Sequence, residues 1–93
     1  MNVEKAKKRI EKKIKRGFKG YPLVSIAYFG EKPELATDVV IQFVQEEGAQ
    51  PQEQRFTSKA DVREDESIQT VLLKIIERAN ANSVTEVEGV AHL

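Results

Sequence analysis

The side chains with the clearest chemical potential in this chain are the Lys and Arg residues of its first 20 positions. This segment carries nine Lys or Arg and two Glu, for a net charge of +7. Residues 21–93 carry six Lys or Arg and thirteen Asp or Glu, for a net charge of −7, so the whole chain is formally neutral. Cationic side chains at this density attract anions, which predicts contact with phosphates or with the carboxylates of an acidic protein surface.

The other residue types offer little for catalysis or metal binding. The chain has no Cys, which excludes disulfides, thiolate metal sites and cysteine nucleophiles. Its one histidine, His92, stands next to the C-terminal residue, where side chains are usually mobile. The acidic segment 61–66 lacks the alternating ligands, central Gly and closing Glu of a calcium loop. We therefore expect no enzymatic activity, no metal and no cofactor.

Residues 2–19 are expected to form the helix that positions the basic side chains. Apolar residues recur at intervals of three or four, as on one face of an amphipathic helix, at Val3, Ala6, Ile10, Ile14 and Phe18. Asn2 is a candidate N-cap, and Gly17, Gly20 and Pro22 mark the end of the helix. The opposite face predicts a contact surface for a partner, formed by Lys5, Lys8, Arg9, Lys12, Lys15, Arg16 and Lys19.

Three strands are expected to follow this helix. Residues 22–29 are apolar on both faces, which predicts a central strand covered at least partly on both sides. Residues 38–46 are ambiguous because a helix over 34–47 is an alternative, but their β-branched and aromatic side chains favour a strand. Residues 53–58 have the polar face expected of a short edge strand.

A second helix and a fourth strand complete the predicted elements. Residues 66–80 form the helix, with apolar side chains in helical spacing at Ile68, Val71, Leu72, Ile75, Ile76 and Ala79. Asp61, Asp65 and Ser67 compete as its N-cap, and Asn80 suits the turn that ends it. Residues 83–90 are expected to form the last strand.

This order of elements, α-β-β-β-α-β, predicts an α+β fold in one domain spanning residues 1–93. A three-stranded meander followed by a helix returns the fourth strand parallel to the first. A right-handed crossover then favours a two-layer sandwich with a mixed four-stranded sheet in order 3-2-1-4 and both helices on one face.

The α-β-β-β-α part of this order, roughly residues 2–80, resembles the double-stranded-RNA-binding fold. The resemblance is one of topology, and that family relies on a lysine-rich start of its second helix to contact phosphates. The corresponding residues here, 61–66, include four acids and one Arg. Carboxylates at a helix N-terminus repel phosphate, so the sequence argues against that activity.

These observations predict a small interaction or regulatory protein that works by binding. Its basic helix would contact an acidic protein partner or a second copy of the chain. The alternative without a partner is that the basic face is simply exposed to solvent. Sequence-independent binding of RNA or DNA backbone through the same residues is the second choice, because the acidic remainder repels a long polyanion. We infer no small-molecule ligand. Because the chain has no long apolar run and no secretory signal, we also expect no membrane contact and a cytoplasmic location.

Overall fold

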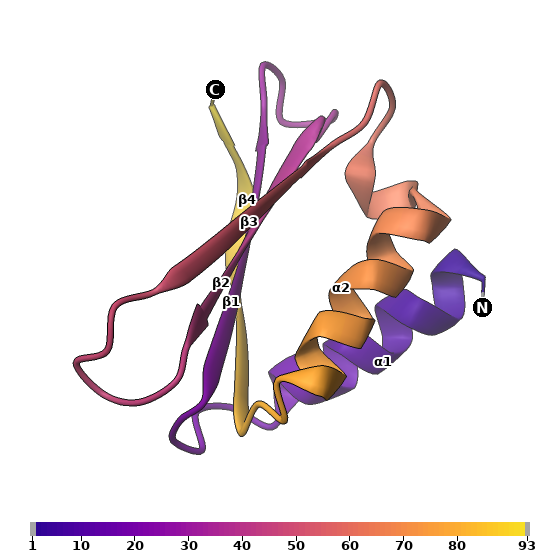
Figure 1. The fold of residues 1–93 in the computed structure, drawn as a ribbon. Coiled ribbons are helices and arrows are strands. Elements are labelled where there is room, and N and C mark those ends of the chain that lie inside the picture. The colour runs from indigo at the N-terminus through magenta and orange to yellow at the C-terminus, as the bar shows by residue number, and fades with distance from the viewer. Residues whose placement is uncertain (1, 93) are drawn as a thin grey trace.

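A computed structural model describes residues 2–92 of the chain, and its elements follow the expected order (Figure 1). The order of helices and strands is α-β-β-β-α-β, and a short 3-10 helix, η1, precedes the second helix. In chain order the elements are α1 (Val3–Lys15), β1 (Leu23–Gly30), β2 (Asp38–Val44), β3 (Gln52–Thr57), η1 (Val62–Glu64), α2 (Glu66–Arg78) and β4 (Ser83–His92).

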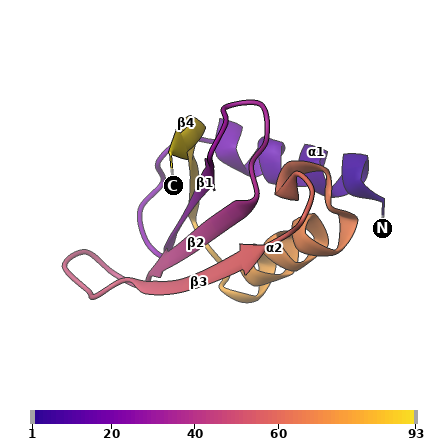
Figure 2. The ribbon, with the colours of Figure 1, turned by 90° about the horizontal axis from the view of Figure 1, so that it is seen from above.

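The four strands form one mixed sheet in the order β3-β2-β1-β4, which confirms the predicted topology. The pairs β1–β2 and β2–β3 are antiparallel, whereas β4 pairs parallel to β1 after the crossover through α2. Both helices cover the same face of this sheet, as the view from above shows (Figure 2). The fold is therefore the predicted α+β sandwich of two layers.

The ambiguous segment 38–46 is a strand, and β2 occupies Asp38–Val44 of it. Its β-branched side chains pack well on a pleated surface, and Val39 and Ile41 are buried beneath the helices. The strand ends before Gln45, so Glu46 and Glu47 belong to the hairpin that leads to β3.

The core lies between the sheet and the two helices. From β1 it takes Val24, Ile26 and Tyr28, which alternate with half-buried residues on the opposite face of the strand. No element among residues 2–92 covers that opposite face, so the expected cover on both sides of β1 is present on the helix side alone.

The buried face of α2 is rotated from the one that the sequence predicts. The residues that are buried on α2 are Gln69, Leu72, Leu73 and Ile76. Val71, which was expected in the core, is 38% exposed. The reason is that α2 packs against α1 as well as the sheet, so its contact face turns toward α1 and includes Gln69.

Helix α1 is shorter than the expected 2–19 and ends at Lys15. Asn2 is its N-cap, as predicted, and accepts a hydrogen bond from the backbone N–H of Lys5 at 2.9 Å. Gly17 takes a φ of +73°, a left-handed conformation that ends a helix and that glycine adopts without strain. Phe18 consequently leaves the apolar stripe, and its side chain is 60% exposed.

The regular pairing of β4 with β1 up to Glu86 sets the direction of the Glu86 side chain, and a bulge follows it. While β1 advances from Ile26 to Tyr28, β4 advances from Glu86 to Val90, with Gly89 at a φ of +76°. Glu86 pairs with Ile26, whose side chain is fully buried on the helix side of the sheet. The carboxylate of Glu86 is thereby placed beside α1.

Candidate functional site

Six of the seven predicted contact residues lie on α1 or at its C-cap, and we call the seven together the basic surface. They are Lys5, Lys8, Arg9, Lys12, Lys15, Arg16 and Lys19, and all seven are exposed. The first five belong to α1, and Arg16 is its C-cap. Lys19 lies beyond the helix, where its backbone N–H donates to the Ser83 hydroxyl at 2.7 Å. The apolar stripe behind the surface is used by the fold itself, with Ala6 and Ile10 buried.

The chain's own carboxylates leave most of this surface unpaired. Within residues 2–92, Lys15 is the one member in an ion pair, with its Nζ 3.3 Å from Oε1 of Glu11 on the same helix. Both side chains of that pair are well exposed, so the pair contributes little. Among the described residues, one ion pair joins α1 to the acidic remainder, and it uses Lys7, whose Nζ lies 2.7 Å from Oε1 of Glu64.

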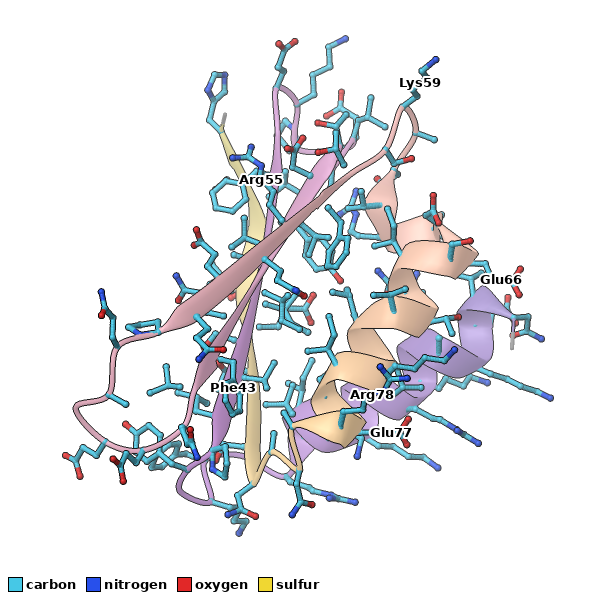
Figure 3. The ribbon with its side chains drawn as sticks, in the orientation of Figure 1. Phe43, Arg55, Lys59, Glu66, Glu77 and Arg78 are labelled. Carbon is cyan, nitrogen blue, oxygen red and sulfur yellow. The ribbon has the colours of Figure 1, made fainter. Side chains whose placement is uncertain are left out.

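A shallow hollow of about 170 Å³ forms where the basic surface meets α2. Four cationic side chains and one carboxylate line it: Arg9, Lys12, Lys13, Arg16 and Glu77. Glu77 lies near the C-terminal end of α2 (Figure 3). This ratio of charges suits a carboxylate or a phosphate group. Lys13 was not among the predicted contact residues, because its position next to α2 depends on how the two helices pack.

The acidic segment 61–66 caps helices, as the sequence indicates. Asp61 is the N-cap of η1 and Asp65 is the N-cap of α2, whereas Ser67 lies inside α2. The carboxylate of Asp61 accepts hydrogen bonds from Nε and Nη2 of Arg63 and from the backbone N–H of the buried Ala36. These bonds, led by those from Arg63, lower the pKa of Asp61 to about 2.

A second candidate site, which the sequence did not predict, is a cleft of about 430 Å³ lined by residues of α1, β1, η1, α2 and β4. Tyr28, Gln69 and Glu86 reach it from three different elements. Burial raises the pKa of Tyr28, and burial together with the nearby charge of Glu11 raises the pKa of Glu86. The one feature of the sequence that could have indicated this cleft is Glu86, which falls on the same face of the last strand as Val84.

The described residues contain no group of three or more His, Asp or Glu side chains that could hold a metal ion. Over the same residues, no helix is long and apolar enough to cross a membrane. Comparisons of the chain with protein-family models, with curated proteins and with solved structures found no match. The functional argument therefore depends on the geometry of the basic surface and the cleft.

Proposed function

We propose that this protein is a non-enzymatic binding protein whose basic surface contacts an acidic surface, on another protein or on a second copy of the chain. The observation that carries the proposal is that six of the seven cations have no ion pair within residues 2–92 while all seven are exposed. Unpaired charge of one sign accelerates encounter with a partner of opposite sign and selects its orientation.

The hollow between α1 and α2 is the centre of this contact. Its Arg and Lys side chains line a space that admits one carboxylate. Arg side chains can hold a carboxylate through two parallel hydrogen bonds, which gives orientation as well as attraction.

Nucleic acid is the second candidate, and the position of the acidic segment argues against it. The pair between Lys7 and Glu64 brings the start of α2 beside the N-terminal half of α1. Glu64 therefore lies beside α1, and the exposed Glu66 begins α2 two residues later (Figure 3). A long polyanion would meet these carboxylates, whereas a compact acidic protein surface can avoid them.

The test compares two double charge reversals with the same change in net charge. Lys8→Glu with Lys12→Glu alters the basic surface, and Lys32→Glu with Lys59→Glu alters exposed lysines outside it. Binding of a labelled decaglutamate peptide is measured by fluorescence anisotropy at ~50 mM salt, where such contacts are strong. We expect about tenfold weaker binding for the first variant and a small change for the second.

The same proteins are then examined by light scattering at low and high salt and with a short RNA duplex. Salt-sensitive dimers that the first variant loses would assign the partner as a second copy. Equal losses in both variants, or no peptide binding by the wild type, would refute the proposal. Duplex binding without peptide binding would replace it with the nucleic-acid function.

A further inference from the structure

The cleft between α1, η1 and β4 has a polar floor that the chain leaves partly unsatisfied. Gln69 is 2% exposed, and its Nε2 donates to the Val62 carbonyl at 3.0 Å and lies 3.4 Å from the Tyr28 hydroxyl oxygen. The orientation of the amide is set by Val62, because only the NH2 end can face a carbonyl oxygen.

With Nε2 held in this way, Oε1 of Gln69 is the acceptor that this cleft-lining residue has left to offer. Among residues 2–92, no group donates a hydrogen bond to this oxygen. Unlike the unpaired Thr70 hydroxyl, the oxygen is not fully enclosed by the described residues. This oxygen can therefore accept a hydrogen bond from water or from a ligand in the cleft. The Tyr28 hydroxyl likewise donates to no described residue. A ligand with a hydrogen-bond donor fits this floor.

The charges around the floor favour a cation. Four carboxylates line the cleft, and three of them are paired: Glu64 with Lys7, Asp61 with Arg63, and Glu11 with Lys15. Glu86 has no ion pair or side-chain hydrogen bond within the described part of the chain. An added positive charge would relieve the repulsion between Glu86 and Glu11, whereas an anion would increase it.

The cleft also has an apolar wall. Ile10 and Ile14 of α1 face it, and Ile14 is only half-buried by the rest of the fold. A short hydrocarbon chain can cover this wall, which would remove apolar surface from water.

We propose that this cleft binds a small aliphatic amine, a function separate from that of the basic surface. The ammonium group contacts the Glu86 carboxylate and donates an N–H to Oε1 of Gln69. The methylene groups lie against Ile10 and Ile14. Five segments of the chain meet here, which is how ligand sites with few polar groups and an apolar wall are usually built.

Titration with n-butylammonium, followed by amide chemical shifts in two-dimensional NMR, tests this proposal. We expect shifts at Tyr28, Gln69 and Glu86, and none with 1-butanol or butyrate, which lack the charge or reverse it. Glu86→Gln should weaken binding by about tenfold, because the ammonium group loses the opposite charge of the carboxylate. The matched control is Glu88→Gln, since Glu88 is exposed on the same strand and does not line the cleft.

A second variant, Glu11→Gln, keeps the proposal testable if Glu86→Gln disturbs the fold, and it should also weaken butylammonium binding. Butyrate binding as tight as butylammonium, shifts confined to residues outside the cleft, or equal affinities for both Gln variants and the wild type would overturn the proposal. A wild type that binds none of the three probes would overturn it as well.

Discussion

Replacing Asp61 with Asn should lower stability by an amount that depends on pH in a defined way. Asp61 makes three kinds of contact: it caps η1, holds the Arg63 guanidinium and accepts the backbone N–H of the fully buried Ala36. Asn has nearly the shape of the protonated acid and lacks the charge. The substitution therefore isolates what the ionised carboxylate contributes.

The magnitude follows from the pKa of Asp61, which folding lowers from its ordinary value of 3.8 to about 2, mainly through hydrogen bonds from Arg63. The carboxylate side chain is 16% exposed, so solvent screens this interaction only in part. The difference between the two pKa values corresponds to about 2 kcal/mol of stability at neutral pH. Because folding lowers the pKa, this stability is complete above pH 3.8, and it falls to about 0.4 kcal/mol at pH 2.

Urea unfolding followed by far-ultraviolet circular dichroism at pH 7, 5, 3 and 2 measures this difference. Asp61→Asn should be about 2 kcal/mol less stable than the wild type at pH 7 and nearly equal to it at pH 2. The control is Glu47→Gln in the exposed β2–β3 hairpin, which should stay within about 0.5 kcal/mol of the wild type at every pH. A deficit for Asp61→Asn that is the same at pH 7 and pH 2 would refute the electrostatic argument.

Three further substitutions test the packing, each by urea unfolding at pH 7. Gly30→Ala should cost at least about 2 kcal/mol, because the new Cβ would collide with the Leu35 carbonyl oxygen; a stable variant would contradict the tight turn. Thr70→Val should stabilise the protein by about 1 kcal/mol, since the Thr70 hydroxyl is buried without a partner among the described residues; a loss of stability would mean that the hydroxyl is bonded. Asn80→Gly should stabilise it by about 0.5 kcal/mol, because Asn80 has a φ of +52°; a large loss would show that the Asn side chain matters more than the backbone conformation.

The elements and their order could be predicted because their signals are local. The spacing of Ala6, Ile10 and Ile14 predicted the inner face of α1, and β-branched residues predicted β2 where a helix was the alternative. The right-handed crossover then determined the sheet order, because few topologies satisfy it. Phe18 was misplaced because the helical register was extended past Gly17, which ends the helix.

The charge on the basic surface was also predictable, since a helix presents residues three and four apart on one side. Whether those charges are satisfied was not predictable. The sequence alone left open the possibility that the acidic remainder neutralises the helix. Packing decides this, because it brings one carboxylate, that of Glu64, within ion-pair distance of a Lys on α1 and leaves the basic surface to solvent.

By itself, the amino-acid sequence determined the helices, the strands, their order and the side of α1 that carries the charge, because each depends on spacing along the chain. Only the tertiary structure decided which residues of different elements come into contact. Gln69 and Glu86 lie on α2 and β4, and neither position is marked by a motif. They share a cleft because α2 turns toward α1 and because β4 pairs with β1 in a register that sets Glu86 beside the buried Ile26. Such contacts depend on packing between elements distant in sequence, which periodicity does not encode.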